Sequence, residues 1–155
     1  MGPAGTAWAQ SGDPPAVPTV VVESASSADA LSVTSAPWRM HFGTHAARVL
    51  RESNPRTREA ALKDLIVLAG TDRGTVDLSA TLMPLLEIVE EGTRTEHRLM
   101  ALQALSVIGV EHSSERAYGR AMAQLYEIAK TEPKNRVRHS AAATLVEFFG
   151  SSEDK

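Results

Sequence analysis

Residues 136–150, RVRHSAAATLVEFFG, decide the fold because two similar stretches precede them at a fixed distance. Arg138 lies forty residues after Arg98, which itself lies forty residues after Arg58. The same register aligns three further sets of positions along the chain: Ala61, Ala101 and Ala141; Leu65, Leu105 and Leu145; and Leu68, Ile108 and Phe148. A period of about forty residues predicts a helical repeat protein, in which each repeat stacks on its neighbours.

Apolar residues recur at helical spacing in six segments, and turn-forming residues separate these segments. The predicted helices cover about residues 38–53, 55–70, 76–92, 94–109 and 113–130, with a sixth from Pro133 to about residue 150. We expect the first helix to begin after Pro37 and the second to end at Gly70, because proline suits a helix start and glycine a helix end. Ser113 or Ser114 is the expected N-cap of the fifth helix. Six helices in three pairs predict an all-α solenoid.

The predicted repeat domain covers residues 37–150, with repeats at about 38–70, 75–110 and 113–150. Residues 1–36 are rich in Ala, Ser, Pro and Gly and lack helical periodicity, which indicates a flexible tail. Within this tail, Ala7-Trp8-Ala9 has the small-x-small form of a signal-peptidase site, although no charged and apolar segment precedes it. An extracytoplasmic location is therefore one interpretation, and a cytoplasmic location is the alternative. Residues 151–155 form a short polar C-terminal tail.

Charge and composition argue against several classes of protein. Residues 37–150 contain 15 Lys and Arg against 14 Asp and Glu, so they lack the concentrated positive charge that nucleic-acid binding needs. The chain has no cysteine, which excludes disulfides, thiolate metal sites and a cysteine nucleophile. No apolar run approaches the roughly 18 residues of a membrane span. The sequence therefore predicts neither a nucleic-acid partner nor a membrane span.

Two consecutive helices carry the pattern of a known repeat family. The leucine-rich segment LMPLLEIVEEG of residues 82–92 contains a proline and is followed by RTEHRLMALQAL, and RVRHSAAATL opens the last helix. Over residues 38–150 the chain resembles HEAT repeats, whose second helix opens on V-R-x-x-A-x-x-x-L after a tight turn. The resemblance implies a right-handed α-solenoid of three HEAT-like helix pairs.

A repeated arginine opens each second helix: Arg58, Arg98 and Arg138. In HEAT repeats such arginines generally brace a turn by bonding carbonyls or acids of the adjacent repeat, and we favour this interpretation. The alternative is a stripe of guanidinium groups that grips an acidic ligand. The family usually has an Asp in the turn ahead of its arginine, whereas the residues six positions ahead here are Glu52, Gly92 and Glu132. We therefore expect a ladder of arginine–acid contacts that is incomplete at the middle repeat.

Helical geometry predicts a row of solvent-facing residues on the second helices: Glu59, Lys63, Leu99, Gln103 and His139. In solenoids such a row lines the concave face, where partners usually bind. Leu99 would form an apolar centre within a polar rim, which suits a peptide or a helix of another protein. A plain solvated surface is the alternative interpretation of the same row.

No catalytic or metal-binding pattern is evident. His41 and His45 lie four residues apart, a spacing that suits zinc, but Phe42 stands where a zincin has Glu and no third ligand is apparent. We therefore expect His45 to be a partly buried packing residue. Glycine-rich phosphate loops, nucleophile elbows and paired catalytic carboxylates are also missing, so the sequence predicts no cofactor and no metal.

These observations favour a non-enzymatic adaptor or scaffold that binds another protein or peptide. Two alternatives stay open: a HEAT-type lyase or DNA-glycosylase-like enzyme, and a structural module of a larger solenoid assembly. The last helix carries Val146, Phe148 and Phe149 close to its end, so we expect uncapped apolar surface there. A homodimer through the uncapped ends of the solenoid is one interpretation of that surface.

Overall fold

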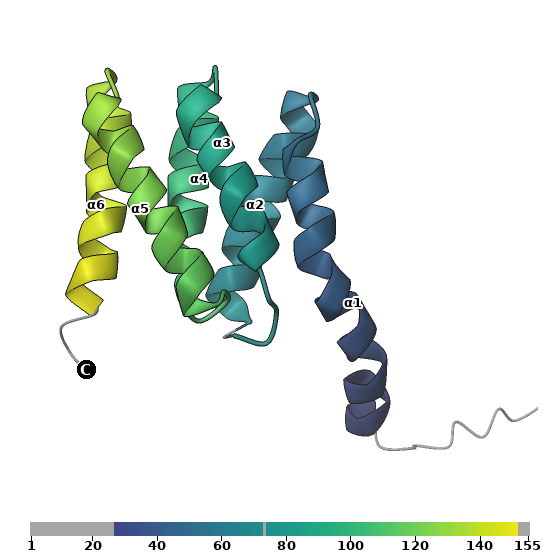
Figure 1. Ribbon diagram of the computed structural model, residues 1–155. Coiled ribbons are helices and arrows are strands. Elements are labelled where there is room, and N and C mark those ends of the chain that lie inside the picture. Colours follow the sequence, from purple (N-terminus) through teal and green to yellow (C-terminus); the bar gives the residue numbers. More distant parts are fainter. Residues whose placement is uncertain (1–26, 73, 152–155) are drawn as a thin grey trace, which may run out of the picture.

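The computed structural model describes residues 27–72 and 74–151, and these residues form helices and loops without any strand. Six α-helices and one turn of 3-10 helix follow one another along the chain (Figure 1). They are α1 (Ser27–Leu50), α2 (Pro55–Thr71), η1 (Ser79–Thr81), α3 (Leu82–Glu91), α4 (Thr95–Ile108), α5 (Glu115–Thr131) and α6 (Asn135–Ser151). The prediction of an all-α protein is confirmed.

The helices lie in two layers. Helices α1, α3 and α5 form one layer, and α2, α4 and α6 form the other (Figure 1). Each helix packs against the other member of its pair and also against the equivalent helix of the neighbouring pair. Segments forty residues apart in the sequence therefore lie side by side in space.

Aliphatic side chains fill the space between the two layers. The side chains that are fully buried there are mostly leucines: Leu62, Leu65, Leu85, Leu86, Leu102, Leu105 and Leu125. Burying one leucine side chain stabilises the folded state by about 1.5–3 kcal/mol, so these leucines contribute strongly to stability. Aromatic residues make up only 5% of the chain, and the core consists mainly of leucine, isoleucine, valine and alanine, with Tyr118 and Met122 also buried in it.

Local sequence signals set several helix ends. Asn54 accepts a hydrogen bond from the backbone N–H of Arg56 (3.0 Å), and Pro55 is the first residue of α2, where its missing N–H costs nothing. Ser114 caps α5 by accepting from the N–H of Ala117 (3.2 Å), which agrees with the predicted serine cap. Gly109 ends α4 with a φ of 49°, a left-handed conformation that favours glycine.

The first helix begins earlier than the sequence predicts. Helix α1 starts at Ser27 and contains Pro37, so the expected start after Pro37 is wrong. A proline inside a helix removes one backbone hydrogen bond and favours a bend, but the helix can continue on both sides. Of the predicted flexible tail, residues 27–36 are helical, and residues 1–26, including Ala7-Trp8-Ala9, lie outside the described part of the chain.

The second helix also ends later than expected. It continues past Gly70 to Thr71, and the N–H of Asp72 bonds to the carbonyl of Leu68 (2.9 Å). Gly70 is therefore a helical residue rather than the stop.

The third helix starts later than the predicted residue 76. The N–H of Leu78 donates to the carbonyl of His112 (2.6 Å), and Asp77 accepts from the N–H of Ser79 (2.8 Å). The ring Nε2 of His112 also lies 2.8 Å from the carbonyl oxygen of Ala69. The N–H of Leu78 thus bonds to the loop between α4 and α5 rather than within an α-helical turn.

Candidate functional site

The predicted row of residues runs across the three helices of one layer, α2, α4 and α6. Lys63, Gln103 and His139 are exposed, whereas Glu59 and Leu99 are half-buried. Because α2 contacts α4 and α4 contacts α6, these side chains lie on adjacent helices. The row is thus a surface that a partner could contact from outside.

An ion-pair network lies at the α2 end of the row. Lys63 Nζ lies 2.7 Å from Glu59 Oε1, so these two residues, one helical turn apart, form an ion pair. Glu59 Oε2 lies 3.8 Å from Nε2 of His97, a buried side chain of α4. The hydrogen bond from Lys63 and its positive charge lower the pKa of Glu59, and His97 adds a smaller effect in the same direction. The sequence analysis missed His97, which is detectable only once α4 is placed against α2.

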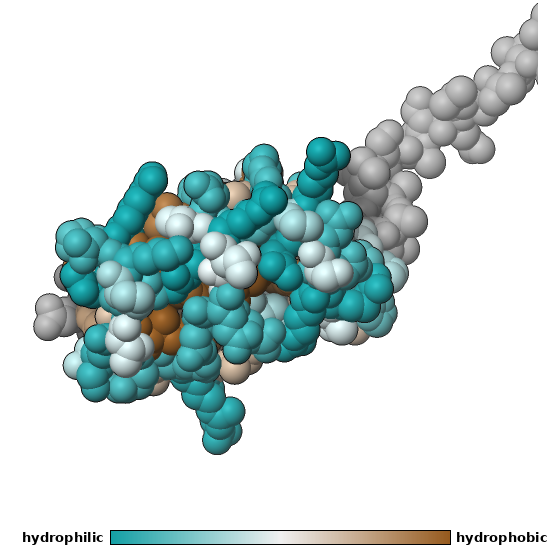
Figure 2. Space-filling model, turned by 90° about the horizontal axis from the view of Figure 1, so that it is seen from above, coloured by the Kyte–Doolittle hydropathy of each residue, from teal (hydrophilic) through white to brown (hydrophobic). Residues whose placement is uncertain are grey.

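Leu99 at the centre of the row presents less apolar surface than the sequence suggests. It is half-buried because part of its side chain packs against the core. In the described residues, the large apolar side chains that are most exposed lie elsewhere: Trp38, Met40, Val67, Met83, Val110, Tyr126, Val146 and Phe149. Viewed along the helices, the surface is largely hydrophilic, and hydrophobic residues show between the polar ones toward the end that holds α5 and α6 (Figure 2).

The repeated arginines donate to nearby turns. Arg58 donates to the carbonyl oxygens of Leu50 (3.1 Å) and Glu52 (2.8 Å). Arg138 donates to the carbonyl oxygen of Glu132 (3.5 Å) and to Oδ1 of Asn135 (2.5 Å). Both guanidinium groups therefore hold the start of a second helix against the end of the first helix of the same pair.

Arg98 makes a different set of contacts that reaches the next pair. Its Nε donates to the carbonyl of Val89 (2.6 Å), and its two terminal nitrogens both donate to the carboxylate of Glu132. Both residues are 5% exposed, so this is a buried bidentate ion pair between α4 and the turn after α5. Arg58 has no equivalent partner, because the counterpart of Glu132 forty residues earlier is Gly92, which carries no carboxylate.

The carboxylate of Glu132 is held in its charged form. Burial on its own raises the pKa of Glu132, but the hydrogen bonds from Arg98 and from the N–H of Lys134 (2.9 Å), together with the charges of these two residues, outweigh it. The net result is a lowered pKa. The pair therefore stays ionised at neutral pH and fixes how the third helix pair sits on the second.

The two histidines of α1 lie at the surface. His41 and His45 are both exposed, and Nδ1 of His45 lies 3.4 Å from a terminal nitrogen of Arg48. The prediction that His45 packs partly buried is wrong, because no described helix pair covers that flank of α1. No group of three or more His, Cys, Asp or Glu side chains that could hold a metal ion occurs in the described part of the chain.

A hollow that the sequence analysis missed lies where α4 ends, α5 begins and α6 ends. Its volume is about 840 Å³, and three carboxylates are among its lining residues: Glu111, Glu115 and Glu147. Tyr118 also lines it and donates from its hydroxyl to the carbonyl of Leu105 (3.0 Å). Burial, followed by the charge of Glu147, raises the pKa of Tyr118 to about 12. The phenol is therefore neutral and acts as a hydrogen-bond donor.

No family model, curated protein or solved structure matches the chain. Among the described helices, none is both long enough and apolar enough to cross a membrane.

Proposed function

We propose that the chain is an α-solenoid of three HEAT-like helix pairs and acts as a non-enzymatic adaptor that binds another protein or peptide. The binding surface is the row on α2, α4 and α6. The observation that carries the proposal is the exposure of equivalent positions on three adjacent helices: Lys63, Gln103 and Ala143 lie forty residues apart and are all exposed. A partner that follows the array can thus contact all three helix pairs with one continuous surface.

The chemistry of the row supports a protein or peptide as the ligand. Opposite charges pair within the row at Glu59 and Lys63, so it carries no strong field of one sign that would select a polyanion. Leu99 adds partly exposed apolar surface to the same row as the amide of Gln103 and the imidazole of His139. A modest apolar centre with hydrogen-bonding neighbours is typical of surfaces that bind peptides and helices.

The adaptor role is tested by comparing two charge-matched double variants in affinity capture from the native source. Gln103→Glu with His139→Glu alters the row, and Met83→Glu with Ala123→Glu adds the same formal charge to exposed positions of the other layer. We expect a partner that wild type and the Met83/Ala123 variant retain and the Gln103/His139 variant loses. Capture of the same proteins by both variants would remove the row as the binding surface.

The repeat architecture is tested by distance measurement between spin labels, which the absence of native cysteine makes simple. With Lys63→Cys and Ala143→Cys, the labels sit on α2 and α6, separated by α4. Adjacent packed helices lie about 10 Å apart, so an array predicts about 20 Å between these backbones. A bundle in which α2 packs directly on α6 would give about half that distance and would contradict the array.

A further inference from the structure

Three exposed side chains with charges of alternating sign occupy equivalent positions on the second helices. Arg56, Glu96 and Arg136 lie forty residues apart, and each is the second residue of its helix: α2, α4 and α6. All three are exposed. We call them the edge charges. Each lies seven residues, about two helical turns, before Lys63 or its counterpart in the later repeats, so the edge charges share a face with the row and border it where the second helices begin.

The turns around the edge charges alternate in sign as well. Residues 50–58 contain three arginines and one glutamate, and residues 130–138 contain four Lys and Arg and one glutamate. The equivalent residues 90–98 contain three glutamates and two arginines. A ligand that crosses the three helices along this edge therefore meets a positive, a negative and again a positive charge.

The edge charges are accessible to a ligand. No residue in the described part of the chain forms an ion pair or a side-chain hydrogen bond with Arg56, Glu96 or Arg136. The neighbouring charge of the row is already engaged, because Lys63 pairs with Glu59 at 2.7 Å. Opposite charges on a ligand can therefore pair with the edge charges without breaking an ion pair between described residues.

The spacing of the edge charges fits one ligand backbone conformation well. Packed helices lie about 8–10 Å apart. A polyproline II segment has three residues per turn and rises about 3.1 Å per residue, so every third side chain returns to the same side after about 9 Å. In a β-strand, by contrast, the third residue points to the opposite side. A polyproline II segment can thus present one charge to each second helix in turn.

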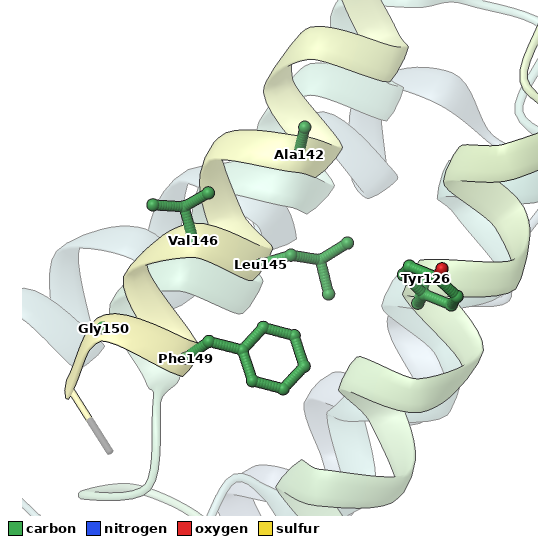
Figure 3. Close-up of a pocket in the computed structure, with 6 residues that line it drawn as sticks. All are labelled: Tyr126, Ala142, Leu145, Val146, Phe149 and Gly150. Atoms are coloured by element: carbon green, nitrogen blue, oxygen red, sulfur yellow. The ribbon is translucent and has the colours of Figure 1, made fainter. Parts of the chain in front are cut away.

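An α-helix with charges seven residues apart would match the same spacing, but helices usually bind in a hydrophobic groove. The apolar surface of the row comes from Leu99 and its neighbour Met100, and both are half-buried. The hollow of about 430 Å³ in which Leu145 and Phe149 point toward Tyr126 lies between α5 and α6 (Figure 3). The larger hollow lies at the ends of α4 and α6. Neither hollow is lined by the row or the edge charges, so a narrow polyproline II segment suits this surface better than a helix.

We propose that the row binds a disordered segment of its partner in the polyproline II conformation, with an acidic, a basic and an acidic residue at every third position. The acids pair with Arg56 and Arg136, and the base pairs with Glu96. Polyproline II is a major conformer of unfolded chains, so such a segment needs little reorganisation. Residues 1–36 contain no Lys or Arg and cannot supply the pattern, so the ligand is another protein. This inference rests on the proposed adaptor function and names the chemistry of the partner.

The test is a selection from a displayed library of random peptides of about 16 residues, long enough for either spacing. The immobilised full chain is compared with a charge-reversed variant, Arg56→Glu with Glu96→Lys and Arg136→Glu. We expect wild type to enrich acid-x-x-base-x-x-acid and the reversed variant to enrich base-x-x-acid-x-x-base. A peptide selected on wild type should bind the reversed variant about tenfold or more weakly, and reversing its three charges should restore binding.

A matched control makes the same three charge changes on the other layer. Glu115→Lys with Arg116→Glu and Arg120→Glu alters exposed residues of α5 and leaves the row unchanged. This variant should enrich the same pattern as wild type. Circular dichroism of both triple variants checks that they fold, which we expect because all six positions are exposed.

Several outcomes would overturn the charge pattern. They are a selection without enriched peptides, enriched peptides without the pattern, and the same peptides on wild type and the reversed variant. Charges seven residues apart would show a bound helix instead. In each case the adaptor function is decided separately by affinity capture with Gln103→Glu and His139→Glu. A partner that this double variant retains would refute the row itself, whereas a partner that it loses would leave the row as the binding surface with a different chemistry.

Discussion

Replacing Glu132 by alanine should destabilise the fold by about 3–5 kcal/mol, because the change leaves a buried arginine without its counter-ion. In the folded chain the side chains of Arg98 and Glu132 are 6% and 4% exposed. After Glu132→Ala, only the bond from Arg98 Nε to the carbonyl of Val89 persists, and both terminal nitrogens lose their carboxylate acceptor. A loss of this size is a large part of the roughly 5–15 kcal/mol that stabilises a typical domain.

A second ion pair in the same chain provides the control. Arg51, in the turn after α1, donates to both oxygens of Glu87 on α3, at 3.1 and 2.9 Å, so this pair is also bidentate and also joins two helix pairs. Its side chains are 53% and 46% exposed, however, and solvent screens their interaction. Glu87→Ala should therefore cost no more than about 1 kcal/mol.

The assay is urea unfolding of wild type and both variants, followed by the helical circular dichroism signal and fitted with a common slope. Losses of equal size for the two variants would refute the argument that burial determines the strength of these pairs. A further variant, Arg98→Met with Glu132→Leu, replaces both charges by apolar groups. It should be more stable than Glu132→Ala, because no unpaired charge remains buried.

Acidification should remove the stabilisation that the ion pair between Arg98 and Glu132 provides. The pKa of Glu132 is lowered in the folded state, so the unfolded chain binds more protons on acidification. The stabilisation is therefore present above the unfolded value of about 4.3 and is lost as the pH falls through the folded pKa. The difference in unfolding free energy between wild type and Glu132→Gln should narrow below about pH 4.3. A difference that stays constant on acidification contradicts the assigned pair.

Two further predictions concern packing and alkaline pH. A Cβ on Gly43 would lie 2.4 Å from the carbonyl oxygen of Asp77, whereas one on Gly119 would meet nothing within 4 Å. Gly43→Ala should lower the unfolding free energy by about 1–3 kcal/mol, and Gly119→Ala should raise it by about 0.5–1 kcal/mol. Both changes are measured from urea unfolding midpoints. Equal shifts for the two variants would contradict the close approach of Gly43 to Asp77. Because burial raises the pKa of Tyr118 to about 12, its contribution is complete below the unfolded value of about 10 and is lost as the pH rises toward 12. Tyr118→Phe should flatten the alkaline fall in stability seen in thermal melts, and an unchanged fall would show that another group causes it.

The forty-residue period predicts which helices become neighbours because it is a local, repeated signal. Leu62 and Leu102 occupy one position of the period and lie in adjacent helices, fully buried. Helical spacing likewise predicts that Lys63, Gln103 and His139 face away from the core. These features need no knowledge of distant contacts. They depend only on where apolar residues fall around a helix of 3.6 residues per turn.

Features set by contacts between distant residues are harder to predict. The late start of α3 depends on the bond from Leu78 to His112, which lies 34 residues further along and has no signature in the residues before Leu82. The partial burial of Leu99 and the approach of His97 to Glu59 depend on how α4 is rotated against its neighbours. The early start of α1 is a different case, because a proline both starts and interrupts helices and its local signal is ambiguous.

Departures from the repeat say more about individual surfaces than the repeat itself. The same arginine position meets two backbone carbonyls at Arg58, a buried carboxylate at Arg98 and an asparagine side chain at Arg138. The difference arises from the residues that occupy the position of Glu52 in the later repeats. In the second repeat this residue is Gly92, and in the third it is Glu132.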